Sequence, residues 1–392
     1  MNMKLRELQF LDYFHHFGGA QRSTVTLVLA IRSLGIHDCR CVSILEPPAE
    51  MSASLGPALS VLRRGMHPPL GRLSWIRRLA GVLSDARVLR AYILNNSRGH
   101  GIVFVTSSVK ALATILVARM GLRRGPRVSF YCRGEGLSSQ YSYAERLLIR
   151  FTVDRYLAVS QATASNMSAW GVDHNNIRVV HTSVDVSSAT ERAESVREHL
   201  LKDRPLVICF IGSLIPLKGL DLLIEAIRLQ RSNRKTLLLV AGATPGPNYN
   251  EFFKHCQVLA GACGPMREVS WLGRVASPWE VLAASDLLCL PSKSEGLPRV
   301  VIEAMAAGRP VVACKAGGTM ELVRDGWNGW LVDRDARALA DVLDELSTVR
   351  DLPSFGIRAR SSIAVHVCPE RQARRVLEAL YDLRTSSHWS SH

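Results

Sequence analysis

The sequence has no long hydrophobic run. None of its apolar stretches approaches the roughly 18 uninterrupted residues of a membrane-spanning helix. The first residues, Met1 to Leu11, include Lys4, Arg6 and Glu7 and lack the apolar core of a secretory signal, so we expect no signal peptide. Nine cysteines are present, but without the spacing of a metal site. We therefore expect reduced, buried thiols in a cytoplasmic protein.

Acidic residues are scarce in the first half of the chain. Residues 1–196 hold 24 Lys and Arg against 13 Asp and Glu, whereas residues 197–392 hold 25 against 21, and the net charge of the whole chain is +15. A cationic excess of this kind favours an anionic partner: a nucleic acid, a membrane surface or a phosphorylated substrate. The length of 392 residues exceeds one ordinary hydrophobic core and predicts two domains.

The most informative stretch follows the apolar run Leu287–Leu290, which predicts a buried strand. Proline and glycine then mark a turn, helix formers occupy Val300–Ala307, and a second apolar run covers Val311–Cys314. Two carboxylates belong to this unit: Glu295 in the turn and Glu303 inside the helix. A bound ligand that lies at the mouth of the sheet can contact both. The alternative is an ordinary helix with one acid near its start and one solvated glutamate.

Three pieces of sequence distinguish these alternatives. They are Glu-Gly-x-Pro at Glu295–Pro298, Glu-Ala-Met-Ala-x-Gly-x-Pro-Val-Val-Ala at Glu303–Ala313, and Gly-Gly-x-x-Glu at Gly317–Glu321. Together they resemble the donor-site signature of retaining GT-B glycosyltransferases, in particular glycosyltransferase family 4 (glycosyl transferases group 1). The resemblance implies an α/β fold in which two Rossmann-like domains, each with a doubly wound parallel sheet, face a cleft.

We expect four segments in the chain. Residues 1–186 form an acceptor-binding domain, 187–204 a polar linker, 205–366 a nucleotide-sugar-binding domain, and 367–392 a crossover helix and tail. The alternation of short apolar runs with helix-like segments supports parallel sheets independently of the resemblance. The predicted strands are Leu8–Phe14, Cys39–Leu45, Gly101–Thr106, Arg127–Tyr131, Arg155–Val159, Ile177–His181, Val207–Ile211, Leu237–Ala241, Val269–Leu272, Leu287–Leu290 and Val311–Cys314.

A second candidate site is the loop between the predicted strand Val207–Ile211 and the next helix. It begins with Gly212 and ends with Lys218 and another glycine. A glycine after a strand and a lysine at a helix start form a phosphate cradle, because helix N-termini favour anions. The alternative, a surface lysine, is electrostatically unfavourable at that end of a helix. The family pattern also has an arginine here, and Ser213 stands in its place.

The resemblance implies a role for each matched residue. Glu303 is assigned to the donor ribose, Glu295 to the transferred sugar, and Lys218 to the donor diphosphate, so that Glu295 and Lys218 are the catalytic candidates. Arg274 and Arg299 are candidates for the cation that the Ser213 position lacks. The remaining donor-binding candidates are loop residues with accessible backbone amides: Gly212, Gly296, Leu297, Gly317 and Gly318.

In the first half, the glycine pair Gly18–Gly19 follows a predicted strand and matches the early loop that lines the acceptor side of the cleft in this family. Arg133, after the predicted strand Arg127–Tyr131, stands with Cys132 where many relatives have a histidine that faces the sugar. We consider two roles for Arg133: it contacts a phosphate or an acceptor carboxylate, or it pairs with Glu135.

The segment Pro57–Gly99 holds eight arginines and a single acid, Asp85, with apolar residues between them. Such a cationic amphipathic segment can lie on an anionic bilayer. The alternative is a solvated helix whose apolar side packs on the sheet.

The resemblance implies a retaining hexosyltransferase-type enzyme that moves a sugar from a nucleotide-diphosphate sugar to a hydroxyl. The basic first half favours a lipid-linked or polysaccharide acceptor, as in cell-surface glycan biosynthesis. The expected partners are the nucleotide sugar, the acceptor and an anionic membrane surface, with no cofactor, metal or nucleic acid. The alternatives are a soluble synthase that accepts a sugar phosphate, a nucleotide-sugar 2-epimerase on the same fold, and a nucleic-acid-binding protein.

Overall fold

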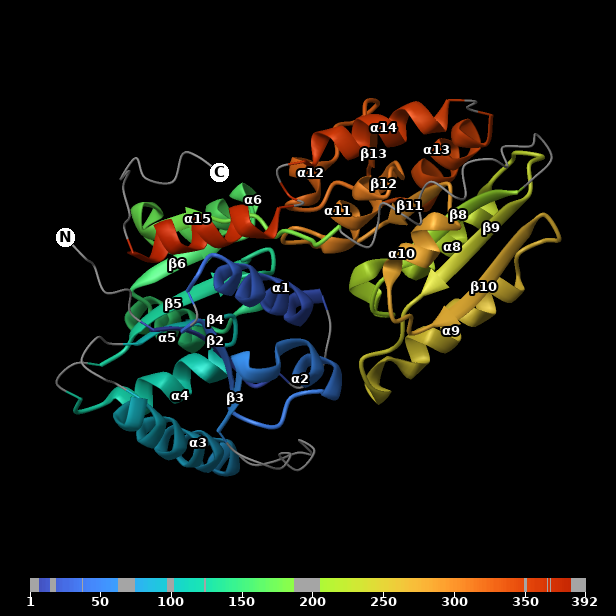
Figure 1. Ribbon diagram of the computed structural model, residues 1–392. Helices are drawn as coiled ribbons and strands as arrows, with labels where there is room; N and C mark the ends of the chain where they lie inside the picture. The colour runs from blue at the N-terminus through green and yellow to red at the C-terminus, as the bar shows by residue number, and fades with distance from the viewer. Residues whose placement is uncertain are drawn as a thin grey trace. The chain divides into compact units, whose positions relative to one another are not determined.

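The computed structural model of the protein has two compact units (Figure 1). The first unit comprises Met1–Ser183 with Pro369–His392, and the second comprises Val184–Cys368. The predicted linker 187–204 lies outside the described residues. The residues that the structure describes are 7–14, 19–36, 38–62, 75–96, 102–122, 125–186, 205–348, 351–364, 366 and 368–381.

The first unit contains a seven-stranded parallel sheet with the order β3-β2-β1-β4-β5-β6-β7. Its strands are β1 (Glu7–Asp12), β2 (Arg40–Ser43), β3 (Leu59–Val61), β4 (Ile102–Thr106), β5 (Arg127–Cys132), β6 (Arg155–Ala158) and β7 (Ile177–Val179). Its helices are α1 (Gly19–Ser33), α2 (Ala49–Leu55), α3 (Trp75–Asn96), α4 (Val109–Arg119), α5 (Tyr143–Thr152), α6 (Gln161–Ala169) and α15 (Pro369–Tyr381). The central strands read as unbroken apolar runs because helices cover both faces of the sheet.

The second unit contains a six-stranded parallel sheet with the order β10-β9-β8-β11-β12-β13. Its strands are β8 (Leu206–Ile211), β9 (Thr236–Ala241), β10 (Arg267–Gly273), β11 (Leu287–Leu290), β12 (Val311–Cys314) and β13 (Gly329–Val332). Its helices are α8 (Leu220–Leu229), α9 (Asn250–Gly261), α10 (Pro278–Ala283), α11 (Arg299–Ala306), α12 (Thr319–Leu322), α13 (Ala336–Thr348) and α14 (Leu352–Ser362). The predicted α/β fold with two doubly wound parallel sheets is confirmed.

Each sheet reverses its strand order once. In the first unit the reversal lies between β1 and β4, and in the second it lies between β8 and β11. At such a switch point the loops after the two strands leave in opposite directions, which opens a crevice outside the carboxyl ends of the strands. The candidate residues of both units are therefore expected after these four strands.

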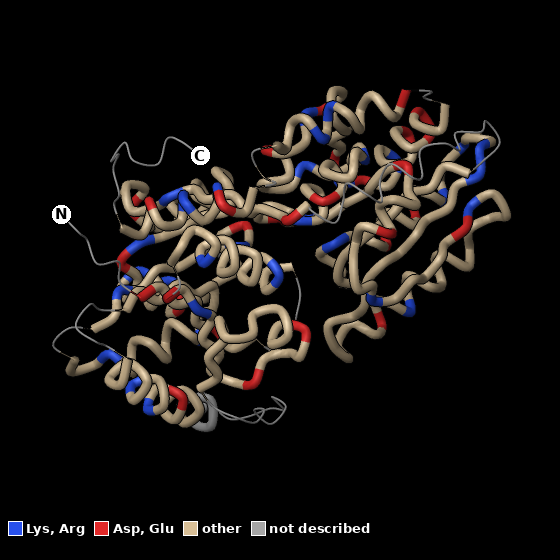
Figure 2. The backbone as a smooth tube through the Cα atoms, in the orientation of Figure 1, with Lys and Arg blue, Asp and Glu red and all other residues tan. Residues whose placement is uncertain are grey.

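Helix α3 carries part of the arginine-rich segment (Figure 2). Its single acid, Asp85, is fully buried, and Tyr13 Oη donates a hydrogen bond of 2.9 Å to Asp85 Oδ2. Leu89 and Ile93 belong to the same buried core. The apolar side of α3 thus packs into the unit, as in the second of the two alternatives. Arg63, Arg64, Arg72 and Arg98, and the side chains of Arg77 and Arg78, lie outside the described residues.

All nine cysteines are free thiols, and seven of them are buried. Along the described ranges, no helix combines the length and the apolar character that crossing a bilayer requires.

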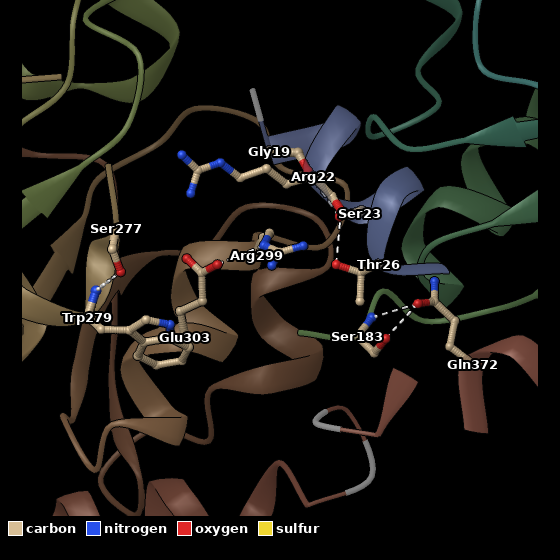
Figure 3. Close-up of polar contacts among 10 residues, drawn as sticks. All are labelled: Gly19, Arg22, Ser23, Thr26, Ser183, Ser277, Trp279, Arg299, Glu303 and Gln372. Carbon is tan, nitrogen blue, oxygen red and sulfur yellow. Dashed lines mark hydrogen bonds and ion pairs between the residues drawn. The ribbon is translucent and has the colours of Figure 1, made fainter. Parts of the chain in front are cut away.

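A buried amide attaches helix α15 to the sheet of the first unit (Figure 3). Gln372 Oε1 accepts hydrogen bonds from the backbone N–H and the hydroxyl of Ser183, at 3.1 and 2.7 Å. Gln372 Nε2 donates to Tyr131 Oη at 3.0 Å, and Tyr131 Oη donates to the Val180 carbonyl at 2.7 Å. Because all these groups are buried, each depends on the others for a polar partner.

We expect Gln372→Leu to lower the free energy of unfolding of the first unit by about 2 kcal/mol, because it leaves the Ser183 groups buried without an acceptor. Urea unfolding monitored by fluorescence measures the effect. The matched control is Glu378→Gln, at an exposed position of the same helix, which should change the value by less than about 0.5 kcal/mol. Equal effects of the two substitutions would contradict the assigned role of the network.

Candidate functional site

In the second unit, the loops after β8 and β11 approach each other closely at the switch point. Gly219 has a φ of +71°, and a Cβ atom on it would lie 2.3 Å from the Pro291 carbonyl oxygen. The backbone N–H of Lys293 donates to the Leu217 carbonyl at 2.8 Å. Both the left-handed conformation and the close approach require glycine at position 219. The two loops are therefore held together at the carboxyl end of the sheet.

This approach brings Lys218 and Glu295 together. Lys218 is the last residue of a short 3-10 turn, Pro216–Lys218, before α8, and Glu295 follows β11. Lys218 Nζ donates to Glu295 Oε1 at 2.6 Å, and the two side chains are 25% and 9% exposed. A carboxylate this buried needs a cationic partner, because removing either partner leaves an uncompensated charge. The two predicted catalytic candidates thus form one ion pair.

Helix α11 supplies a second ion pair. Arg299 is its first residue, and Arg299 Nε donates to Glu303 Oε1 at 2.7 Å across one helical turn (Figure 3). Glu303 is buried, and the neighbouring Val301, Ile302 and Met305 pack into the core. The N-cap of the helix is Pro298, whose side chain makes no capping hydrogen bond. The first turn of α11 therefore presents backbone N–H groups at the carboxyl end of the sheet.

The glycine loop after β12 joins the same cluster. The N–H of Gly318 donates to the Glu295 carbonyl at 3.2 Å, and Gly317 has a φ of +43°. Gly296 and Leu297 are buried between these residues in the β11 loop. Three loops, after β8, β11 and β12, thus converge.

Gly212 and Arg274 lie at the carboxyl ends of other strands. The N–H of Gly212 donates to the Ala241 carbonyl at 3.0 Å, and a Cβ on the neighbouring Gly242 would lie 1.8 Å from the Gly212 oxygen. Arg274 is exposed and follows β10, two strands away from β8. Ser213 is also exposed. Arg274 and Arg299 are the two candidates for the cation that the Ser213 position lacks. Of these two, only Arg299 belongs to an element, α11, that starts at the switch point.

The chain contains one Asp-x-Asp sequence, Asp333-Arg334-Asp335, of the kind that holds a metal in other transferases. It follows β13, at the edge of the sheet. Asp333 Oδ1 accepts from Lys315 Nζ at 2.9 Å. Asp335 Oδ1 accepts from the backbone N–H groups of Arg337 and Ala338, both at 2.9 Å, in the first turn of α13. These two aspartates therefore have an ion-pairing role and a helix-capping role.

The first unit has a small pocket at its own switch point. It is bounded by the ends of β1, β4 and β5, and its polar lining includes Asp12, Thr24, Ser107 and Arg133. Asp12 Oδ1 accepts from the Tyr13 N–H at 2.7 Å, and Asp12 Oδ2 accepts from Ser107 Oγ at 3.2 Å. Burial raises the pKa of the Asp12 carboxyl, and these hydrogen bonds, with the nearby Arg133 guanidinium, partly oppose that shift.

Asp12 and Ser107 are functional candidates that sequence reasoning missed. The available signal was a polar residue directly after a buried strand, since Asp12 ends β1 and Ser107 follows β4. In the prediction, the first strand ran on to Phe14 and placed Asp12 inside it. The structure ends β1 at Asp12, where its pairing with β2 stops.

The other candidates of the first unit are only partly assembled. Gly18 lies outside the described residues. Gly19 begins α1, and its carbonyl accepts a hydrogen bond from Ser23 Oγ at 3.0 Å. Arg133 Nη1 donates to the Ala20 carbonyl, and its guanidinium lies 4.8 Å from the centre of the Tyr131 ring. Burial raises the pKa of Cys132 to about 11, which keeps this thiol protonated and non-nucleophilic near neutral pH.

Two family models match consecutive parts of the chain. The model for Glycosyltransferase Family 4 matches residues 17–188, and the model for Glycosyl transferases group 1 matches residues 191–355. D-inositol 3-phosphate glycosyltransferase of Mycobacterium sp. (strain KMS) is 34% identical over 199 residues, which are 49% of this chain and 44% of that protein. The corresponding protein of Corynebacterium efficiens is 31% identical over 243 residues, 57% of this chain and 55% of its own length. The chain thus spans about half the length of the curated relatives it matches.

Solved structures match the chain over nearly its full length. The Anabaena protein HepE, in complex with UDP and glucose, has a TM-score of 0.77 at 20% identity, covering 97% of this chain and 100% of HepE. Sucrose-phosphate synthase from Thermosynechococcus elongatus has a TM-score of 0.78 at 16% identity, covering 97% and 99%. At these identities the matches establish a shared fold.

We expect Gly219→Ala to disturb the contact between the β8 and β11 loops, because alanine is strained at this φ and its Cβ would meet the Pro291 oxygen. The free energy of unfolding of the second unit should fall by about 2 kcal/mol. The control is Gly264→Ala, where a Cβ has no neighbour within 4 Å; it should have little effect. Chemical unfolding of both variants tests the comparison, and an unchanged stability of Gly219→Ala would show that the loops tolerate separation.

Proposed function

Because this chain belongs to glycosyltransferase family 4 and has the GT-B fold, we propose that it transfers a sugar, with retention of configuration, from a nucleotide-diphosphate sugar to a hydroxyl group. The proposed acceptor is a lipid-linked or polysaccharide glycan of cell-surface biosynthesis, which the enzyme meets at the membrane. The observation that carries the proposal is the Lys218–Glu295 pair beside the start of α11. There, a cation, a carboxylate and the backbone amides of the first turn of α11 meet at one switch point.

The donor diphosphate is proposed to bind between Lys218 and the first turn of α11. An ammonium group has three N–H donors, so Lys218 can keep its bond to Glu295 and also donate to phosphate oxygens. Backbone amides at a helix start and in a glycine loop such as Gly317–Gly318 favour the same anion. UDP and UDP-glucose occur in the HepE complexes, which makes UDP the first nucleotide to test.

Glu303 is proposed to hold the ribose. A carboxylate that accepts hydrogen bonds from a ribose hydroxyl is a common element of nucleotide-binding sheets. The ion pair with Arg299 keeps the Glu303 carboxylate charged in a buried position and fixes its orientation. Arg299 also brings positive charge to the first turn of α11. It is therefore proposed to replace the arginine that the family pattern has at the Ser213 position.

In the proposed reaction, the bond between the anomeric carbon and the donor phosphate oxygen breaks as the acceptor oxygen bonds to the same face of the sugar. The acceptor proton passes to the leaving phosphate oxygen. Lys218 and the amides of α11 stabilise the negative charge that develops on the leaving diphosphate. Glu295, held by Lys218, contacts the sugar ring. No metal or organic cofactor has a part in this scheme.

The acceptor hydroxyl is proposed to bind in the pocket of the first unit. Asp12 offers a hydrogen-bond acceptor, Ser107 a hydroxyl, and Tyr131 and Phe14 apolar surface. Carboxylate and hydroxyl groups against an aromatic wall are a chemistry that suits a sugar or polyol. Donor and acceptor are thereby assigned to separate units, so the binding of each can be tested alone.

A sugar-phosphate acceptor is the second candidate. The relatives named as D-inositol 3-phosphate glycosyltransferases support it, and Arg133 supplies a cation at the same pocket. Turnover with a panel of free polyols, sugar phosphates and lipid-linked glycans distinguishes the two acceptor classes. If only phosphorylated acceptors react, the lipid-linked proposal is wrong.

For the donor site, we expect Lys218→Ala to weaken UDP binding about 10- to 100-fold, the loss typical of a charge-assisted hydrogen bond. Isothermal titration with UDP, GDP and ADP measures the affinity and identifies the base. Lys254→Ala is the control, because Lys254 is an exposed lysine that pairs with Glu251 on α9. Unchanged UDP affinity in Lys218→Ala would remove the phosphate role.

For the ribose assignment, we expect Glu303→Gln to reduce nucleoside diphosphate affinity by at least about tenfold, and Glu303→Ala to abolish turnover. Comparison of UDP with inorganic pyrophosphate supplies the control, because pyrophosphate has no ribose and should bind Glu303→Gln as it binds the native protein. Equal losses for both ligands would show that Glu303 acts through Arg299 and the phosphates instead.

For the acceptor pocket, we expect Asp12→Asn to raise the KM for the acceptor about tenfold or more, with the affinity for UDP unchanged. The substitution preserves size and removes the charge. Steady-state kinetics with the acceptor varied, at saturating donor, measures the change. A loss of UDP affinity with no change in the acceptor KM would contradict the assignment of Asp12 to the acceptor.

A further inference from the structure

The amino edge of the sheet in the first unit carries a second surface, opposite to the edge that holds the Asp12 pocket. Helices α3, α4 and α5 precede β4, β5 and β6, so each helix ends where the next strand begins (Figure 1). Helix α4 packs against both α3 and α5. Three helix carboxyl ends therefore lie side by side at this edge.

Each of these helix ends exposes one large apolar side chain. Leu94 near the end of α3 is 57% exposed, Met120 directly after α4 is 65% exposed, and Phe151 near the end of α5 is 78% exposed. Phe151 is the most exposed large hydrophobic residue in the described part of the chain. Single exposed apolar residues are common on protein surfaces, but a group at adjoining helix ends marks an interaction site.

Hydrogen bonds between the helices join the ends at which these residues lie. Arg90 Nη1, on α3, donates to the carbonyls of Ala118 and Met120 at 3.2 and 2.6 Å. Arg119 Nη1, at the end of α4, donates to the Thr152 carbonyl at 3.2 Å. Leu94 lies one turn after Arg90, on the same side of α3, and Phe151 precedes Thr152. The three residues thus lie at adjoining helix ends, and we call Leu94, Met120 and Phe151 the rim.

Cations outnumber acids near the rim. Arg90 and Arg119 lie near the carboxyl ends of α3 and α4. The two acids of the three helices do not reach the rim: Asp85 is buried against Tyr13, and Glu145 closes the capping box at the opposite end of α5. Asp154, which follows α5, accepts a hydrogen bond from the Val128 N–H at 2.7 Å. Exposed Arg150 and Arg127 add cations at the ends of α5 and β5.

We propose that this rim is a docking surface for an anionic lipid bilayer. Leu94, Met120 and Phe151 enter the interfacial region of the bilayer, and the surrounding arginines contact lipid phosphates. The partner class follows from the charge, since an apolar group with arginines beside it complements a surface that has apolar chains below anionic headgroups. The surface differs from the arginine-rich face of residues 57–99 that the sequence predicted, because it includes only the end of α3. It deepens the proposed function by giving the membrane encounter a location.

The test is flotation of the full chain with vesicles of phosphatidylglycerol and phosphatidylcholine, compared with vesicles of phosphatidylcholine alone. We expect binding to the anionic vesicles only, and its loss at about 1 M salt, where charge attraction is screened. The double variant Met120→Ser/Phe151→Ser should bind the anionic vesicles at least about tenfold more weakly, because two apolar side chains that enter the bilayer are lost. Arg150→Glu should weaken binding in the same direction.

The matched control is Val258→Ser on α9 of the second unit, because Val258 is 72% exposed and lies away from the rim in the chain. Its vesicle binding should equal that of the native chain. Absence of binding by the native chain, or an equal loss in Val258→Ser, overturns the proposal. Self-association that the double variant abolishes, without vesicle binding, assigns the rim to a second copy of the chain and also overturns it.

UDP affinity and turnover with a water-soluble acceptor separate this proposal from the proposed function. The double variant should retain both, since none of its positions lies in a candidate site. A native chain that binds vesicles without turning over any nucleotide sugar leaves the docking surface standing and removes the proposed transfer reaction. A native chain that turns over nucleotide sugar without binding vesicles supports the transfer reaction and removes the docking surface.

Discussion

The close approach of the loops after β8 and β11 is the constraint on which the candidate donor site depends. Only glycine fits at position 219, because a Cβ there would lie 2.3 Å from the Pro291 carbonyl oxygen. The close contact at Gly219 also fixes the position of Lys218. Lys218 thereby reaches Glu295, which in turn receives the Gly318 N–H on its carbonyl. Two charges that would each be costly when half-buried alone stabilise each other. The ion pair is thus a consequence of strand order as much as of side-chain chemistry.

The sequence predicted this part of the chain well, and the physical reason is local. Strands Leu287–Leu290 and Val311–Cys314 have the predicted bounds, because proline and glycine border short, fully buried apolar runs. The Asp12 pocket was not predicted, because the end of β1 depends on pairing with a strand some thirty residues away. Helix α9, Asn250–Gly261, also went unpredicted; Cys256 is its one buried residue, so it lacks the apolar stripe that marks a buried helix face. The roles of the site residues remain predictions.

Ser213 gives the donor site its distinctive charge distribution. Where the family pattern has an arginine after the first strand of the unit, this chain has a small exposed residue. Two cations at the switch point, Lys218 and Arg299, are each paired with a carboxylate. A diphosphate that binds Lys218 and Arg299 shares these two cations with acids, which lowers the net positive charge that they offer it. Backbone amides of α11 and the Gly317–Gly318 loop accordingly have a larger share in holding the anion.

The parallel strands of the first unit give its sheet two different edges, a carboxyl edge and an amino edge, and each has its own kind of surface. At the carboxyl edge, loops leave the strands and bring Asp12 and Ser107 into a polar pocket. At the amino edge, helices end, and their unsatisfied carbonyls attract cations: Arg90 and Arg119 each donate to the last carbonyls of the next helix. Basic charge therefore collects at that edge for a structural reason, before any partner is considered. Exposed Leu94, Met120 and Phe151 have no comparable structural explanation, and it is these side chains, rather than the arginines, that favour a bilayer as the partner.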